Sequence, residues 1–251
     1  MKIFLSGMEG SPFITKYMVK KGLKMKYNLV SYYYIQKNQK QLELTDMIRD
    51  NSELILVDSG AHSFQFGKKV DWVEYTKKYA EFIKEFDRPN VLGYFEMDIE
   101  NIIGYDKVLE LRKILEKVTN KIIPVWHPTR GIDDYEKMCQ QYAGKVIAIG
   151  GFRGTDIKDE QFLMFLKVAK KYNCKVHCLG MTRIKVLDKV PFDFTDSASW
   201  KMKAVYGRDM NNRKLPRVKG VEQEEQFIHN YILAMDMQKH YHRKWQKECQ
   251  D

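Results

Sequence analysis

The feature that most constrains this chain is a regular alternation of short apolar segments with segments of helical periodicity. Eight segments rich in β-branched and aromatic residues are predicted to be strands. They are Lys2–Gly7, Asn28–Tyr34, Leu54–Gly60, Val91–Asp98, Lys121–His127, Val146–Gly151, Lys175–Gly180 and Phe192–Ser197. Strands that alternate with helices pair in parallel. Eight such units in a chain of 251 residues therefore predict a (β/α)₈ TIM barrel.

The alternation is less regular at the two ends of the chain. Residues 11–23 are a weak helix candidate, because Pro12 and Gly22 interrupt them. Residues 221–247 are predicted to form one long C-terminal helix. No linker, internal repeat or low-complexity tract divides the chain. Residues 1–251 are thus expected to be a single domain of the α/β class.

The composition is that of a soluble protein, with 44% hydrophobic and 30% charged residues. No apolar run approaches the roughly 20 residues of a membrane span. The first residues lack the apolar core and cleavage site of a signal peptide. The four cysteines have no framework spacing, which is typical of a reducing compartment. We therefore expect a cytoplasmic protein, in the host cytoplasm if its source is a virus, with no membrane partner.

The chain is basic, with a net charge of +10, which favours a polyanionic partner without specifying one. Residues 201–220 hold much of the excess and, with two glycines and a proline, are predicted to be a loop. Their basic residues are Lys201, Lys203, Arg208, Arg213, Lys214, Arg217 and Lys219. A solvated basic loop and a nucleic-acid contact explain this segment about equally well.

Functional groups of TIM barrels lie at the carboxyl ends of the strands. The predicted strand ends carry five carboxylates: Asp58, Glu96, Asp98, Asp193 and Asp196. Carboxylates on two strands suit glycosyl transfer, where one attacks the anomeric carbon and the other transfers protons.

Other strand ends supply groups that could hold a flat ligand. The Gly150–Gly151 pair lets such a ligand approach the backbone closely. His62 and Met181 could flank the ligand, and His127 ends the fifth strand. Each member also has a structural alternative. Glu96 and Asp98 could cap helices, Asp193 could bond neighbouring backbone, and His127 could be a core histidine.

Two of these motifs resemble the tRNA-guanine transglycosylases, a family of (β/α)₈ enzymes. Asp58-Ser59-Gly60 is similar to the family's Asp-Ser-Gly-Gly signature, and Phe192-Asp193-Phe-Thr-Asp196 to the segment that carries its nucleophile. Phe95-Glu96-Met-Asp98 and Ile147-Ala-Ile-Gly150-Gly151 are less specific matches to its base-recognition acid and glycine loop. The resemblance spans roughly residues 54 to 200. His127 stands where the family usually carries a glutamine.

The resemblance implies a role for each matching residue. Asp196 would attack C1′ of a guanosine and displace guanine, with a second acid, Asp193, three residues earlier. Asp58 would be the general acid and base. The further substrate-binding residues that it implies are Ser59, Gly60, His62, Glu96, Asp98, His127, Gly150, Gly151, Leu179, Met181 and Asp193. Of these, Asp98 and the glycines would read the base, while His62 and Leu179 or Met181 would cover its two faces.

The family's zinc motif, Cys-x-Cys-x-x-Cys with a later histidine, is absent from the sequence, so no metal or other cofactor is expected. The short chain without that segment is most similar to the small viral and bacterial enzymes that insert 7-deazaguanines into DNA. The leading hypothesis is therefore exchange of guanine for a 7-deazaguanine such as preQ0, with DNA favoured over tRNA. Members of the family often form dimers, which leaves a homodimer open.

Two other functions remain open from the sequence. The first is a base-excising glycosidase that uses the same carboxylates with water as the acceptor. The second is a barrel that binds modified nucleic acid without chemistry. Incorporation of a labelled base separates the first from exchange, and the behaviour of an Asp196→Ala variant separates the second.

Overall fold

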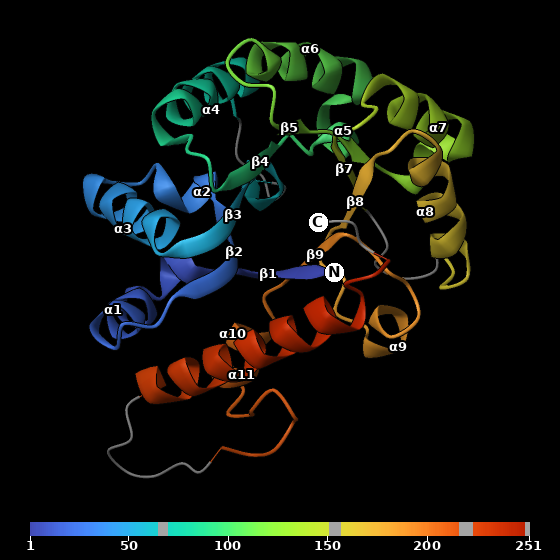
Figure 1. Cartoon of the computed structure of the whole chain (residues 1–251). Helices are drawn as coiled ribbons and strands as arrows, with labels where there is room; N and C mark the ends of the chain where they lie inside the picture. The colour runs from blue at the N-terminus through green and yellow to red at the C-terminus, as the bar shows by residue number, and fades with distance from the viewer. Residues whose placement is uncertain (65–69, 151–156, 216–222, 249–251) are drawn as a thin grey trace.

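The computed structural model describes residues 1–64, 70–150, 157–215 and 223–248. The strands run parallel in the order β5-β4-β3-β2-β1-β9-β8-β7-β6. Their bounds are β1 Lys2–Ser6, β2 Met25–Ser31, β3 Ser52–Asp58, β4 Val91–Phe95, β5 Ile122–Ile123, β6 Val125–Trp126, β7 Val146–Ile149, β8 Lys175–Cys178 and β9 Phe194–Ser197. Figure 1 shows the strands enclosed by a ring of helices, as expected for the predicted barrel.

The nine strands of the described ranges correspond to the eight predicted ones, because β5 and β6 are two halves of one run. Pro124 separates the halves, and a proline has no N–H to give to the ladder. The first half pairs with β4 and the second with β7. The Pro124 carbonyl still accepts a hydrogen bond from the N–H of Ala148 at 2.9 Å. This run therefore closes the barrel, which confirms the predicted (β/α)₈ fold.

The helices follow the strands in turn. Their bounds are α1 Pro12–Lys20, α2 Tyr32–Ile35, α3 Gln39–Asp50, α4 Trp72–Phe86, α5 Glu100–Ile103, α6 Tyr105–Glu116, α7 Gly131–Gln141, α8 Gln161–Lys171, α9 Ile184–Leu187, α10 Ser199–Val205 and α11 Gln223–Lys244. Short 3₁₀ turns lie at Met8–Gly10, Ala61–Phe64 and Pro128–Arg130. The second predicted strand ends early, because Tyr32–Ile35 is helical. None of the helices in these ranges combines the length and apolarity that a membrane span needs.

The predicted C-terminal helix is α11, which packs across β1 and β2 beside α1 and α10 (Figure 1). Its Gln238 side chain is fully buried and donates to the carbonyls of Ile3 and Tyr27, both at 2.7 Å. Tyr231 donates to the Asn28 side chain at 2.8 Å. Buried polar groups without partners are costly, so these bonds fix α11 against the first two strands.

The core has an inner and an outer part. Apolar side chains such as Phe4, Leu56, Phe95 and Phe194 fill the inside of the barrel. Two larger clusters lie outside it, one under α1–α6 and α11 and the other under α7 and α8. Because successive strand residues point to opposite faces, each inward core residue is followed two positions later by another inward residue. This alternation determines which strand-end residues reach the mouth of the barrel.

Candidate functional site

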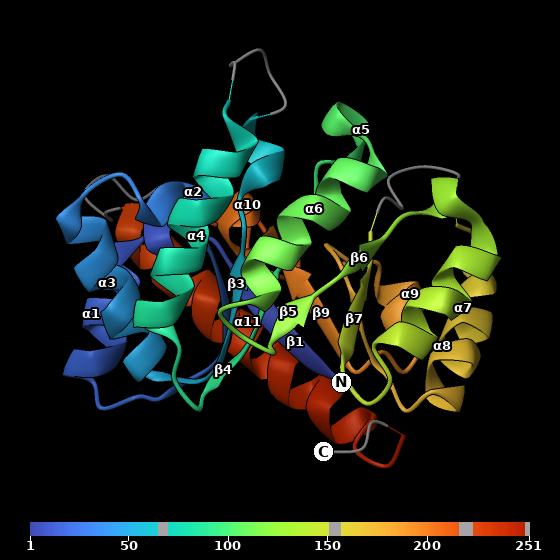
Figure 2. The same cartoon turned by 90° about the horizontal axis from the view of Figure 1, so that it is seen from above.

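The candidate site is the carboxyl end of the barrel, which we call the mouth. In Figure 2 the mouth is the upper end, where α2, α5 and α10 lie, and the N-terminus is near the lower end. Seven strands each place one side chain at this end, two positions beyond a residue that faces the inside of the barrel. These residues are Ser6, Ser31, Asp58, His127, Gly150, Leu179 and Asp196. The carboxyl groups of Glu9, Asp58, Asp98 and Asp196 belong to this end.

Asp58 ends β3 and is held by two hydrogen bonds to its Oδ2 atom. The Ser31 hydroxyl donates at 3.2 Å and the N–H of Gly60 at 3.0 Å. Burial raises the pKa of Asp58 to about 6, and the charges of Asp98 and Asp196 add to this rise. Asp58 can therefore gain and lose a proton near neutral pH, as a general acid and base must.

Gly60 is required for the turn after Asp58. Its φ of +71° is disfavoured for other residues. A Cβ atom at this position would also lie 2.4 Å from Cβ of Tyr33 and 2.7 Å from Oγ of Ser31. Ser59 is buried, its carbonyl accepts from the Tyr75 hydroxyl at 2.7 Å, and its own hydroxyl has no hydrogen-bond partner in the described residues. The side chain of His62 lies outside the described part of the structure.

Asp196 lies near the end of β9 and is held from three directions. Its Oδ1 atom accepts from the N–H of Gly180 at 2.8 Å and contacts Nε2 of His177 at 3.0 Å. Its Oδ2 atom accepts from the Ser6 hydroxyl at 3.3 Å. His177 is fully buried inside the barrel, 5.0 Å from the ring centre of Phe95. The carboxylate is thus fixed in position at the mouth.

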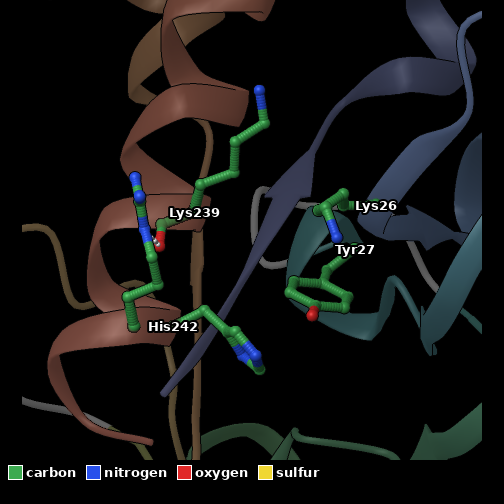
Figure 3. A pocket seen from close by; sticks show the side chains of 5 residues that line it. Lys26, Tyr27, Lys239 and His242 are labelled. Atoms are coloured by element: carbon green, nitrogen blue, oxygen red, sulfur yellow. Dashed lines mark hydrogen bonds between the residues drawn. The ribbon is translucent and has the colours of Figure 1, made fainter.

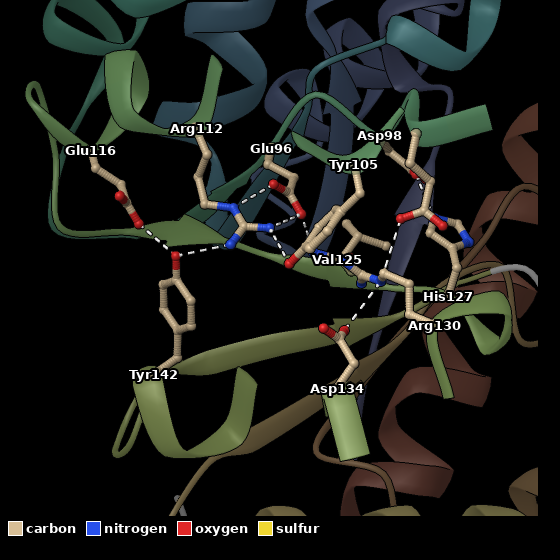
Figure 4. Close-up of polar contacts among 11 residues, drawn as sticks. Glu96, Asp98, Tyr105, Arg112, Glu116, Val125, His127, Arg130, Asp134 and Tyr142 are labelled. Atoms are coloured by element: carbon tan, nitrogen blue, oxygen red, sulfur yellow. Dashed lines mark hydrogen bonds and ion pairs between the residues drawn. The ribbon is translucent and has the colours of Figure 1, made fainter. Parts of the chain in front are cut away.

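A second carboxylate–histidine pair lies beside these residues. Nε2 of His127 is 2.6 Å from Oδ1 of Asp98 (Figure 4). Burial opposes protonation of His127, but the hydrogen bond and charge of Asp98 outweigh it and raise the histidine pKa. Gly150 makes room for the ring, because a Cβ there would lie 2.8 Å from Cε1 of His127. Gly151 lies outside the described residues.

Glu96 was expected in the mouth, but it faces the outer helices. It follows the inward Phe95 by one position, so its side chain points outward. Both of its oxygens bind Arg112 of α6, at 2.5 and 3.0 Å, and Oε1 also accepts from the N–H of Val125 (Figure 4). Burial raises the pKa of Glu96 despite this pairing. Glu96 therefore joins the sheet to the helix layer instead of lining the mouth.

Asp193 was also expected in the mouth and lies at the opposite end of the barrel. It precedes β9, and its Oδ2 atom accepts from the N–H of Val176, at 2.8 Å. Its carbonyl accepts from the N–H of Lys2 at 2.8 Å. The structure thus bears out the alternative that Asp193 bonds neighbouring backbone.

The two residues expected to cover a bound base differ in position. Leu179 is half-buried and packs on the inner core below the mouth. Met181 is buried in the outer cluster with Phe162 and Phe192, so its side chain does not face the mouth.

The segment expected to be a basic loop begins as a helix, because α10 extends to Val205. Lys201 donates to the Gly7 carbonyl at 3.1 Å, and Lys203 donates to the Met210 carbonyl at 2.7 Å. These two amines hold backbone together. A turn around the buried Asp209 follows and leaves three exposed basic residues: Arg208, Arg213 and Lys214. Arg217 and Lys219 lie outside the described residues.

Glu9, which follows β1, belongs to the mouth but carried no sequence signal. It is 4% exposed, and its Oε2 atom has no hydrogen-bond partner in the described residues. Burial raises its pKa to about 7, although backbone N–H groups of Glu9 and Ser31 and the charge of Lys201 lower it. The charge of Asp58 raises it further, so the two acids share one environment. Ser31 and His177 were missed as well, and Ser6, at the end of the first predicted strand, was given no role. The spacing of two from an inward residue would have indicated both serines.

Within the described ranges, no group of three His, Cys, Asp or Glu side chains is placed to hold a metal ion. A cavity of about 360 Å³ lies away from the mouth, between the start of β2 and the end of α11. Figure 3 shows Lys239 and His242 of α11 on one side of it and Lys26 and Tyr27 on the other. Lys26 pairs with Glu53 at 3.1 Å, and Lys239 with Asp236 at 2.9 Å.

No protein-family model matches the chain, and no curated protein sequence matches it either. A structure from Aquifex aeolicus VF5, described as a structural study, is similar with a TM-score of 0.57 and 12% identity, over 96% of this chain and 92% of that one. The tryptophan synthase alpha chain from Legionella pneumophila subsp. pneumophila gives a TM-score of 0.48 and 10% identity, over 94% and 92%. At such identities the first likeness shows the barrel fold alone.

Proposed function

We propose that this protein is a transglycosylase that exchanges guanine in a nucleic acid for a 7-deazaguanine such as preQ0. One observation carries the proposal: Asp58 and Asp196 stand on different strands of one mouth, and their surroundings differ. Asp196 is fixed by three contacts, whereas Asp58 has a pKa of about 6. Two carboxyl groups with divided tasks are what a retaining glycosyl transfer requires. The resemblance of both motifs to the tRNA-guanine transglycosylases indicates that the base exchanged is guanine.

The first half of the reaction releases guanine. The Asp196 carboxylate attacks C1′ of the target guanosine, so that a C1′–O bond forms while the C1′–N9 bond breaks. The leaving base takes up the proton that Asp58 carries. Because the pKa of Asp58 is raised to about 6, a useful fraction is protonated near neutral pH.

The second half installs the new base. Asp58, now ionised, removes the N9 proton of the incoming 7-deazaguanine, whose N9 attacks C1′ and breaks the bond to Asp196. The enzyme returns to its starting protonation state. Asp98 and His127 lie beside these acids and would recognise the edge of the base, with a carboxylate oxygen accepting from its N–H groups.

The acceptor is a nucleic acid whose target nucleotide is single-stranded or flipped out, because the mouth of a barrel cannot reach a base inside a duplex. The net charge of +10 supports a polyanion, and Arg208, Arg213 and Lys214 remain exposed for phosphate contacts. DNA is favoured over tRNA, because these 251 residues do not contain the zinc motif that the resemblance associates with the tRNA enzymes.

The experiment is incubation of the protein with preQ0 and with single-stranded DNA, duplex DNA or tRNA, followed by digestion and mass spectrometry of the nucleosides. Exchange predicts that one polymer gains the deazapurine while free guanine appears in equal amount. An Asp196→Asn variant should bind the polymer and exchange nothing. Release of guanine without incorporation would identify a glycosidase. Binding without any chemistry, in both proteins alike, would refute the proposal.

A further inference from the structure

A cluster of aromatic side chains with one lysine borders the mouth beside Asp58. We call it the aromatic rim and define it as Tyr33, Tyr34, Lys37, Phe64 and Trp72. Tyr33 and Tyr34 belong to α2, which follows β2, and Phe64 ends the turn that follows β3. Figure 2 shows α2 at the mouth end of the barrel.

The rings contact one another edge to face. The ring centres are 4.7 Å apart for Tyr33 and Phe64, 5.1 Å for Tyr33 and Tyr34, and 5.7 Å for Phe64 and Trp72. The neighbouring Tyr32 is buried in the core, whereas Tyr34 is 43% exposed. Packing of the fold therefore explains Tyr32 but leaves the Tyr34 ring open to a partner.

Lys37 lies over two of these rings. Its Nζ atom is 5.2 Å from the ring centre of Tyr33 and 4.7 Å from that of Tyr34. Both contacts have cation–π geometry. No carboxylate in the described ranges forms an ion pair with Lys37. The rim thus combines exposed aromatic surface with a positive charge.

The rim is joined directly to the catalytic turn. Gly60 lies against Tyr33 so closely that a Cβ there would be 2.4 Å from Cβ of Tyr33. The same Cβ would be 2.7 Å from Oγ of Ser31, and that hydroxyl donates to Asp58. The turn that carries Asp58 and the helix that carries the rim tyrosines are therefore in direct contact.

We propose that the aromatic rim binds the unpaired nucleotides that flank the target guanosine, with a base on Tyr34 and a phosphate at Lys37. This inference rests on the nucleic-acid substrate of the proposed function. A nucleotide turned into the mouth leaves its neighbours partly unstacked, and aromatic side chains replace the lost stacking for any base. A nearby lysine neutralises the backbone charge. The rim is thus the surface for an unpaired strand.

The test is fluorescence anisotropy with a labelled single-stranded DNA that contains one guanine, measured over a range of salt concentrations. Tyr34→Ala should weaken binding at least about fivefold, and Tyr34→Phe should retain it, because stacking needs the ring and not the hydroxyl. Lys37→Ala should reduce the salt dependence by about 0.7 in the log–log slope, as expected for one phosphate contact on a single strand.

Tyr17 and Lys21 provide the matched control, because Lys21 lies over the Tyr17 ring at 5.9 Å. Lys21 follows the end of α1, close to where β2 begins at the end of the barrel opposite the mouth. Tyr17→Ala and Lys21→Ala should leave the affinity unchanged. The inference is overturned if Tyr34→Ala binds like the parent, or if the parent binds no single strand. The inference is also overturned if the parent protein binds a peptide through Tyr34 but binds no oligonucleotide.

Failure of this inference differs from failure of the proposed function. If base exchange occurs and the rim variants behave like the parent, the rim is not the strand surface while the transglycosylase stands. If the rim variants lose the oligonucleotide but no polymer ever gains a new base, the rim binds nucleic acid and the proposed chemistry is wrong.

Discussion

The mouth and the opposite end of the barrel, which we call the floor, use the same kinds of side chain for different purposes. Asp193, just before β9, and Asp196, within it, show the difference. At the floor, the Asp193 carboxylate bonds the backbone of β8. At the mouth, Asp196 contacts the side chains of Ser6 and His177 and the N–H of Gly180 in a turn. Groups at the floor thus hold the sheet together, as Gln238 also does. Groups at the mouth hold one another.

The two ends also differ in charge. Side chains around the floor cavity are basic, and Lys26 and Lys239 pair with carboxylates on the surface. The mouth buries Glu9 and Asp58, and burial raises the pKa of both acids. The charge of Asp58 further raises the pKa of Glu9, and the charges of Asp98 and Asp196 further raise that of Asp58. Burying like charges together destabilises a fold, so such an arrangement is typical of a site selected for chemistry.

The largest expected effect comes from substituting Asp193 and Asp196. Asp196→Asn should lower the rate of base exchange at least about a thousandfold, because the nucleophile is lost. Its folding should be nearly unchanged, since the amide can still accept from Gly180. Asp193→Ala should keep its activity per folded molecule and lower the free energy of unfolding by about 1–3 kcal/mol, because Val176 loses its acceptor. Single-turnover kinetics and urea denaturation of both variants measure the contrast. An inactive but stable Asp193→Ala would reverse it.

The next effect concerns Asp58 and pH. Asp58→Asn should slow guanine release by about 100- to 10,000-fold, the range of a lost general acid. In the parent, release requires protonated Asp58, so its rate should fall as pH rises through about 6. The variant should lose this dependence. Single-turnover release between pH 5 and 8 provides the measurement, and an unchanged pH profile in the variant would exclude Asp58 as the acid.

The fold was largely predictable, because eight apolar runs with helical segments between them leave few alternatives to a barrel. The errors arose from strand phase and strand ends. Glu96 follows the inward Phe95 by one position and therefore faces outward. Asp193 precedes a strand that begins at Phe194, two residues later than predicted. The first error is one of strand phase, and the second concerns the end of the strand at which the residue lies.

The missed residues depend on contacts that no local pattern records. Glu9 sits in a short 3₁₀ turn without periodicity, and it reaches the mouth only because that turn lies beside β2. His177 lies within an apolar strand, where its ring fills the barrel beside Phe95. The composition of residues 201–220 predicts a loop, although α10 extends to Val205. The Lys201 amine binds the Gly7 carbonyl and the Lys203 amine that of Met210, and neither contact follows from a local pattern.

A smaller effect is expected from Gly150→Ala. The new Cβ would lie 2.8 Å from Cε1 of His127 and 3.1 Å from Cγ1 of Val125, so the ring must move away from Asp98. We expect the KM for the free base to rise about tenfold, because a displaced recognition group loses its hydrogen bond to the base. His127→Ala combined with Gly150→Ala should be no worse than His127→Ala alone. Fully additive losses would show that Gly150 acts by another route.

The smallest effect tests whether a buried carboxylate at the mouth lowers the free energy of unfolding. The pKa of Glu9 is raised to about 7, so its ionised form destabilises the folded state at high pH. Glu9→Gln should therefore increase the free energy of unfolding at pH 8 by about 1–3 kcal/mol. The gain should be much smaller at pH 5, where Glu9 in the folded protein is protonated and only its ionisation in the unfolded chain, above the usual pKa of 4.5, still disfavours folding. Urea denaturation at the two pH values measures the difference, with the exposed Glu85→Gln as a control that should show none. A Glu9→Gln variant that is less stable at pH 8 would mean that ionised Glu9 stabilises the fold. Glu9 would then act like the stabilising groups of the floor.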